Sequence, residues 1–177
     1  WGLKVVDYFT PLNQSALSSA DEDLGSGGPM VLPDSVGSAA HPRLLVGAGK
    51  EGKIYLIDRD NMGKFHVGTD QVVQEVSALP GGGSGGSYGT PAFFSDGTTA
   101  RIYYGGQNTA ARTFTIANAA LSTTPDSKST DSYGAHGSTP SISANGAANG
   151  IVWDLEFNTG QLLSLIHISE PTRQAEI

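Results

Sequence analysis

The sequence predicts an all-β fold, in the form of a partial β-propeller of about three four-stranded antiparallel blades with a repeat of 48–49 residues. Three strand-like segments rich in β-branched and aromatic residues are centred on Ile54, Ile102 and Ile151, which are 48 and 49 positions apart. Glycine is frequent, with 24 residues, and charged residues make up only 15% of the chain. Many turns between short strands produce that balance, whereas a disordered chain has fewer apolar residues.

The N-terminal part begins with residues 1–9, which read as a strand and suggest that the chain opens inside a blade. The helical signal is confined to the next segment, where Leu17, Ala20 and Leu24 are roughly one helical turn apart. Ser15 is the candidate N-cap of this short helix. We therefore expect one or two helical turns before the first repeat.

The first repeat is a variant of the other two. Residues 28–33 form its expected opening strand, and 34–42 form a longer loop. The apolar segments 43–49 and 54–58 flank a short polar turn at 50–53, which is the pattern of a β-hairpin.

The second and third repeats have their proline and their turn dipeptide at matching positions. Pro91 and Pro140 each stand 11 positions before the isoleucine of the repeat, and proline at the start of a strand removes no ladder hydrogen bond. An Asp-Gly and an Asn-Gly dipeptide end at Gly97 and Gly146, where a tight hairpin needs positive φ. Each repeat is therefore expected to open with a Pro-led strand and a tight turn.

Two stretches of low apolar content, 80–86 and 122–132, are interpreted as flexible connectors that are too short to separate domains. The predicted domain is a partial propeller over residues 1–162. Its blades are expected at roughly 1–65, 66–118 and 119–162.

The C-terminal residues 163–177, LSLIHISEPTRQAEI, break the repeat and contain no glycine. They resemble the translation of a transposon-based sequencing adapter, so we interpret them as a non-native tail outside the fold. Closed propellers need about four to eight blades. The chain is thus expected to be an open arc of a larger protein, with apolar end faces and unpaired strand edges.

Composition excludes several kinds of partner. The net charge is −7 and the pI about 4.8, without the Lys and Arg clusters that neutralise nucleic-acid phosphates. There are no cysteines, hence no disulfides and no thiolate metal site. No apolar run reaches the length of a membrane-spanning helix. The expected partners are a small molecule, a glycan or a protein.

Two acidic segments are candidate cation sites. The segment 58–63 resembles a calcium loop, but Met62 and Thr69 occupy positions where an EF-hand needs oxygen ligands, so a turn leaving a strand is preferred. Asp21, Glu22 and Asp23 precede a glycine-rich stretch and are interpreted as a solvated acidic loop, with a carboxylate cation site as the alternative. We predict no metal site.

The remaining reactive residue types form no recognisable pattern. His41, His66 and His136 are far apart in loop-like sequence, and His167 lies in the suspected tail. Residues 81–86 are glycine-rich but lack the lysine and helix of a phosphate loop. The aromatic residues of the repeat strands are interpreted as packing between blades: Tyr55, Tyr103, Tyr104 and Trp153.

Four segments resemble pyrroloquinoline-quinone-like β-propeller proteins, which are bacterial relatives of the quinoprotein alcohol dehydrogenases: 7–11, 23–29, 46–58 and 139–143. The stretch 45–65 carries the most specific part, and 158–162 resembles the turn and strand of a quinoprotein repeat. The resemblance covers most of residues 1–162. It implies an exported protein, periplasmic or extracellular.

The family's enzymes oxidise alcohols or sugars with pyrroloquinoline quinone (PQQ) held over a tryptophan. Their calcium is bound by a Glu, an Asn and an Asp, a further Asp is catalytic, and many have a vicinal cysteine pair. This chain has no cysteine, and none of its positions matches the metal ligands or the catalytic Asp. We carry over no functional residue, because a shared scaffold does not transfer activity.

Three functions follow as hypotheses. The first is a binding or scaffold module with no catalytic site in this chain and no cofactor. The alternative is part of a PQQ- and calcium-dependent alcohol or sugar dehydrogenase whose active site lies in blades outside this chain. A glycan-binding or hydrolytic propeller is the third.

Overall fold

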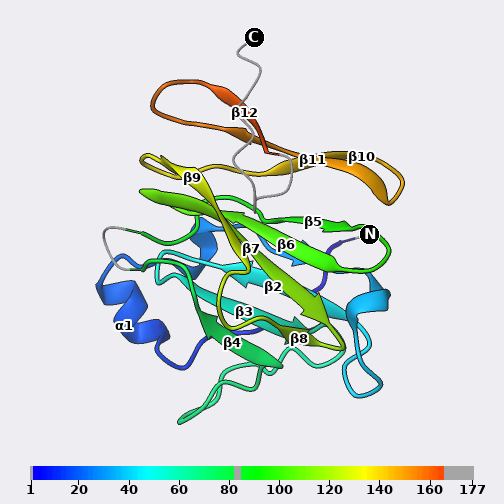
Figure 1. Cartoon of the computed structure of the whole chain (residues 1–177). Coiled ribbons are helices and arrows are strands. Elements are labelled where there is room, and N and C mark those ends of the chain that lie inside the picture. Colours follow the sequence, from blue (N-terminus) through cyan, green and yellow to red (C-terminus); the bar gives the residue numbers. More distant parts are fainter. Residues whose placement is uncertain (1, 82–84, 166–177) are drawn as a thin grey trace.

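The computed structural model describes residues 2–81 and 85–165, and its strands form three antiparallel sheets stacked in chain order (Figure 1). The first sheet has the order β1-β2-β3-β4. Its strands are β1 (Met30–Val31), β2 (Leu44–Ala48), β3 (Lys53–Asp58) and β4 (Gln74–Ser77).

The second sheet follows the same order of neighbours, β5-β6-β7-β8, with β9 as an additional partner of β7. Its strands are β5 (Ala92–Ser95), β6 (Ala100–Gly105), β7 (Thr109–Ala117), β8 (Ala120–Leu121) and β9 (Ser127–Tyr133). The third sheet has the order β10-β11-β12. Its strands are β10 (Ser141–Asn145), β11 (Ala148–Leu155) and β12 (Leu162–Leu165).

The prediction of an all-β, antiparallel chain is therefore confirmed, with sheets of four, five and three strands where four strands each were expected. The first sheet includes β4, past the blade boundary expected near residue 65. The second includes β9, past the boundary expected near residue 118.

The core lies between the sheets, and the middle sheet is buried on both faces. Ile102 and Tyr104 of β6 pack with Leu56 of β3 in the cluster between the first and second sheets. Tyr103, between them in the sequence, packs with Val152 of β11 in the cluster between the second and third sheets. Successive side chains of a strand point to opposite faces, so the continuous apolar run of β6 is the signature of a two-sided interior strand.

The predicted hairpins are confirmed. Strands β2 and β3 pair from Leu44 with Asp58 to Ala48 with Ile54. Strand β5 pairs with β6, and β10 with β11, around turns in which Gly97 has φ +87° and Gly146 has φ +60°. These are left-handed values that glycine adopts without the steric cost of a Cβ.

The short helix lies earlier than predicted. Helix α1 (Gln14–Ser19) has Asn13, not Ser15, at its N-cap, and Leu17 is its buried residue. The chain leaves the helix at Asp21, whose φ is +57°, before the 3₁₀ turn η1 (Leu24–Ser26). A left-handed residue breaks helical periodicity, which is why the predicted spacing to Leu24 is wrong.

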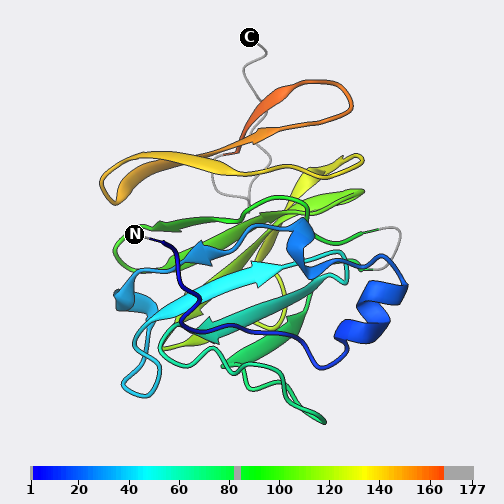
Figure 2. The same cartoon turned by 180° about the vertical axis from the view of Figure 1, so that it is seen from behind.

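The prediction that residues 1–9 form a strand is wrong over the described positions 2–8. Leu3 and Val5 are exposed, and the segment makes one isolated parallel bridge, between Phe9 and Lys64. Figure 2 shows this segment crossing the outer face of the first sheet. A strand needs a partner along its length, and the described chain does not place one there.

The polar stretch 122–132 was expected to be a flexible connector, but most of it is β9. Its residues are largely exposed, and the strand pairs with β7 from Thr113–Ser127 to Thr109–Tyr133. Main-chain hydrogen bonds can hold an edge strand that has no apolar face, so the hydrophobic pattern does not predict such a strand. The loop expected at 34–42 includes a second 3₁₀ turn, η2 (Asp34–Val36), with Val36 buried.

At the C-terminus, β12 includes Leu163 to Leu165, which belong to the suspected adapter-derived tail and pair with β11. The rest of that tail, 166–177, lies outside the described residues. So do positions 82–84 of the glycine-rich connector.

Neighbouring repeats are in close contact just before their first strands. A Cβ placed on Gly28 would overlap Thr90 Oγ1, and one placed on Gly89 would overlap Thr139 Oγ1. Gly28, Thr90 and Thr139 each stand two residues before their own first strand, at equivalent positions of the repeats. Small residues are therefore required where the three sheets converge.

We expect Gly28→Ala to destabilise the fold by about 1–3 kcal/mol, because the new methyl group overpacks this contact. Thr90→Ala removes the overlapping oxygen and should restore part of the loss in the double variant. Urea unfolding of the two single variants and the double variant measures the coupling. Additive losses would show that the two residues do not touch.

Candidate functional site

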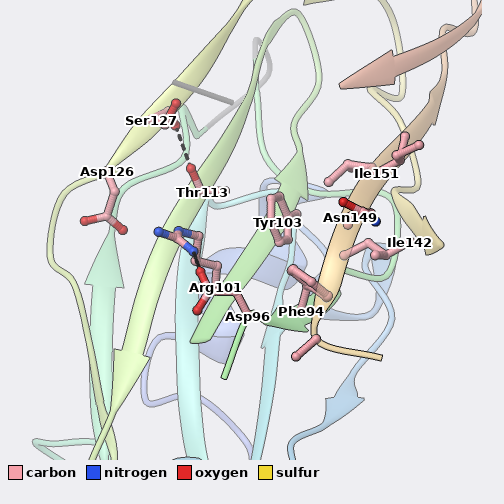
Figure 3. A pocket seen from close by; sticks show the side chains of 13 residues that line it. Phe94, Asp96, Arg101, Tyr103, Thr113, Asp126, Ser127, Ile142, Asn149 and Ile151 are labelled. Atoms are coloured by element: carbon pink, nitrogen blue, oxygen red, sulfur yellow. Dashed lines mark hydrogen bonds and ion pairs between the residues drawn. The ribbon is translucent and has the colours of Figure 1, made fainter. Parts of the chain in front are cut away.

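A groove of about 360 Å³ opens between the second and third sheets (Figure 3). Small-molecule sites commonly have volumes of about 300–1,000 Å³. Its lining comprises Phe94, Asp96, Arg101, Tyr103, Thr113, Asp126, Ser127, Ile142, Ala147, Asn149, Gly150, Ile151 and Val152.

The alternation of side chains along the strands sets one wall of the groove. Arg101 and Tyr103 lie two residues apart on β6, and Tyr103 pairs with Thr113 of β7. All three therefore point from the second sheet toward the third. Gly150 of β11 lies opposite, where an added Cβ would come within 2.6 Å of the Phe94 ring. Glycine at this position lets the two sheets close on the aromatic side of the groove.

Asp96 and Arg101 form an ion pair at one end of the groove, with 3.1 Å between Arg101 Nη1 and Asp96 Oδ2. The backbone N–H groups of Thr98 and Thr99 both donate to Asp96 Oδ1, at 2.8 and 2.7 Å. The Thr99 and Thr98 hydrogen bonds, followed by that of Arg101, lower the pKa of Asp96. This carboxylate is ionised at neutral pH and orients the guanidinium.

A second carboxylate, Asp126, lies further along the groove, beside β7. It accepts hydrogen bonds from the Thr115 backbone N–H and from Ser122 Oγ. Thr113 Oγ1 donates to the Ser127 carbonyl at 3.2 Å. The polar wall is therefore built from groups that are already positioned by the protein.

The groove lining combines two carboxylates, one guanidinium, several hydroxyl groups, an amide and an aromatic wall. Its formal charge is −1. Such a set can hydrogen-bond a ligand and pack against an apolar face.

Two acidic segments from the sequence are explained by ion pairs. In the segment 58–63, Asp58 Oδ2 lies 2.9 Å from His41 Nδ1, and Asp60 Oδ2 lies 2.7 Å from Arg43 Nη2. Burial raises the pKa of Asp58, but the hydrogen bonds from His41 and from the Asp60 backbone outweigh it and leave that pKa lowered. The preferred interpretation, a turn that leaves β3, is confirmed.

In the segment 21–23, two aspartates form ion pairs with the ammonium group of Lys50. Its Nζ lies 3.1 Å from Asp21 Oδ2 and 2.7 Å from Asp23 Oδ2, and it donates to the Asp21 carbonyl at 2.9 Å. Within residues 2–81 and 85–165, no group of three or more His, Cys, Asp and Glu side chains is arranged to hold a metal ion.

The histidines do not come together. His41 pairs with Asp58, a contact that its sequence context did not indicate. His66 is exposed, and His136 stacks edge-on between Tyr88 and Phe157, with 5.1 Å between ring centroids on each side. His167 lies outside the described residues.

Two of the four aromatic residues predicted to pack between blades, Tyr103 and Tyr104, lie between sheets. Tyr104 lies in the core between the first two sheets, with its ring 6.2 Å from that of Phe114. Tyr103 lies between the second and third sheets. Tyr55 packs against Phe9 on the outer face of the first sheet, and Trp153 donates from Nε1 to Ser143 Oγ at 2.9 Å.

Sequence reasoning missed the most deeply buried carboxylate, Asp154 of β11. It is fully buried and accepts hydrogen bonds from Ser138 Oγ at 2.7 Å and from the Tyr133 hydroxyl at 3.2 Å. Burial raises its pKa, against the opposing effect of those two donors. Tyr133 is the last residue of β9 and Ser138 lies in the connection to β10, so Asp154 joins this part of the chain to β11.

Glu156, two residues after Asp154, also accepts hydrogen bonds from the protein, but its pKa is lowered where that of Asp154 is raised. Hydrogen bonds from the Thr159 side chain and backbone, and from the backbones of Asn158 and Gly134, lower its pKa to about 2. Asp154 and Glu156 are thus structural carboxylates outside the groove.

No helix within residues 2–81 and 85–165 is long and apolar enough to cross a membrane. Comparisons with family models, curated proteins and solved structures found no match.

Proposed function

We propose that this chain is an open arc of a PQQ-like β-propeller and serves as a binding or scaffold module of an exported bacterial protein. The observation that carries the proposal is the repeated architecture. Three meanders of antiparallel strands are stacked in chain order, and each first strand is preceded by a proline. The close contacts Gly28–Thr90 and Gly89–Thr139 support a radial arrangement, in which the sheets are nearest at one edge.

The described side chains support binding over catalysis. Asp154 and Glu156 accept hydrogen bonds from protein donors on both carboxylate oxygens, and Asp58 pairs with His41. A catalytic acid or base needs access to a substrate proton. The groove between the second and third sheets is one place where the described side chains leave room for a small ligand.

The alternative proposal is a segment of a quinoprotein dehydrogenase, favoured by the resemblance at 46–58. In that case the quinone, the calcium ion and the catalytic Asp belong to blades outside this chain. The present sheets would then support the site without contributing to it.

The two proposals are separated by a dye-linked oxidation assay. The full-length protein is incubated with pyrroloquinoline quinone and calcium, and dye reduction is followed with a panel of alcohols and sugars. We expect no turnover above the quinone-free control. Quinone-dependent dye reduction would replace the binding proposal with the dehydrogenase.

A further inference from the structure

We infer that the groove between the second and third sheets binds an uncharged, hydroxyl-rich ring ligand of the carbohydrate class. This inference rests on the proposed binding function and adds its ligand class. It concerns a site between two adjacent sheets, formed entirely by residues of this chain.

The first argument is the division of the groove lining into an apolar end and a polar end. Phe94, Tyr103 and Ile142 form an apolar end, and Figure 3 shows Arg101, Thr113 and Asp126 toward the other end of the lining. A pyranose ring has the same division, with C–H groups on its faces and hydroxyls on its rim. An aromatic ring contacts the C–H face of the sugar. The planar carboxylate, amide and guanidinium groups hydrogen-bond to hydroxyls that lie in the plane of those groups.

The second argument is the supply of hydrogen-bonding groups. Among the residues drawn in Figure 3, Thr113 bonds to Ser127 and Arg101 to Asp96, and no bond runs from Tyr103 or Asn149. The Tyr103 hydroxyl and the Asn149 amide are therefore available to a ligand in the groove. Both a donor and an acceptor are needed for a hydroxyl group, and these two side chains provide both.

The third argument is charge. Asp96 and Asp126 place two negative charges at the groove, and the single guanidinium of Arg101 is paired with Asp96. An anionic ligand, such as a phosphate ester or a tricarboxylate quinone, would meet a net charge of −1 without an unpaired cation in the lining. A neutral ligand meets no such repulsion.

The volume agrees with this class. About 360 Å³ accommodates one or two pyranose rings. The groove is also held open by the fold, because both walls belong to paired strands.

The test is protein-observed NMR of the full chain with cellobiose and maltose as neutral probes. Glucose, glucosamine and glucuronate serve as a neutral, cationic and anionic set built on one ring. We expect the neutral sugars to shift the backbone amides of Asn149 and Gly150. Glucuronate should bind more weakly than glucose, and added salt should reduce the difference.

Two variants test the groove itself. Tyr103→Phe removes one hydroxyl and keeps the ring, and we expect about a three- to tenfold loss of sugar affinity. Tyr88→Phe, outside the groove, is the matched control and should leave affinity unchanged. Asn149→Gly removes the amide and keeps a residue suited to φ +56°, with Asn118→Gly, at φ +50°, as its control.

Three results would overturn the inference: no shift with any neutral sugar, binding of glucosamine alone, or glucuronate binding as tightly as glucose. Equal affinities for Tyr103→Phe, Asn149→Gly and their controls would also do so. A negative sugar result with an inactive dye-linked assay removes the groove inference and leaves the binding or scaffold proposal. Quinone-dependent turnover removes that proposal whatever the groove binds.

Discussion

Replacement of Phe114 by alanine is expected to lower the free energy of unfolding by about 3–5 kcal/mol. Phe114 lies on β7 with none of its surface exposed, in the core between the first and second sheets. It pairs with Ile102 across the strands and packs edge-on against Tyr104. Truncation removes the apolar contact and leaves a cavity that two rigid sheets cannot close.

Phe65→Ala is the matched control, because this phenylalanine is 48% exposed. A surface substitution of this kind usually changes stability by less than about 0.5 kcal/mol. Guanidinium unfolding of both variants gives the comparison. Similar losses for the two would show that the first and second sheets do not share a core through Phe114.

Asp154→Ala is expected to cost about 2–4 kcal/mol, because it leaves the buried hydroxyls of Tyr133 and Ser138 without their acceptor. The loss should be accompanied by loosening of the connection between β9 and β10. Hydrogen exchange of the amides in that connection measures the second effect. Asp131→Ala, at an exposed carboxylate of β9, should leave both stability and exchange unchanged.

The pH dependence of Asp154 follows from its burial. The pKa of Asp154 is raised in the folded state, so its ionisation costs stability. Relative to Asp154→Asn, the wild type should become less stable as pH rises from about 4, the ordinary value for aspartate, through the raised pKa. Below that window the carboxyl is protonated in both states and the difference should be constant. Urea unfolding across this range would contradict the assignment if the difference were flat throughout.

Local chemistry accounts for the features that could be predicted from the amino-acid sequence. The hairpins at Gly97 and Gly146 depend on dipeptides that favour positive φ. The strands around Ile54, Ile102 and Ile151 depend on runs of β-branched and aromatic residues. These preferences act over a few residues, so they can be recognised without knowing the tertiary neighbours.

The polar strand β9 and the displaced helix show where local preference was insufficient. Strand β9 has no apolar alternation, and it forms because the edge of β7 offers unpaired main-chain groups. Helix α1 ends where Asp21 takes a left-handed conformation and Lys50 binds the acidic loop. Both depend on partners many residues away.

The candidate groove depends on tertiary structure in the same way. Its polar and apolar walls come from β5 to β7, from the start of β9 and from the hairpin of β10 and β11. Arg101 and Asn149 lie 48 positions apart and line the same groove only because the third sheet stacks on the second. Likewise, Asp154 is buried because the hydroxyls of Tyr133 and Ser138, which come from earlier in the chain, bind its carboxylate.

The chain's own pattern was thus enough to establish an all-β protein built from repeated hairpins, since turn chemistry and strand propensity are local. Which face of each strand is buried, which carboxylates are enclosed and where a ligand can enter were established by the stacking of the sheets. Burial and hydrogen bonding depend on neighbours in space. The sequence of a strand such as β6, which is apolar on both faces, does not indicate which sheet packs on which face.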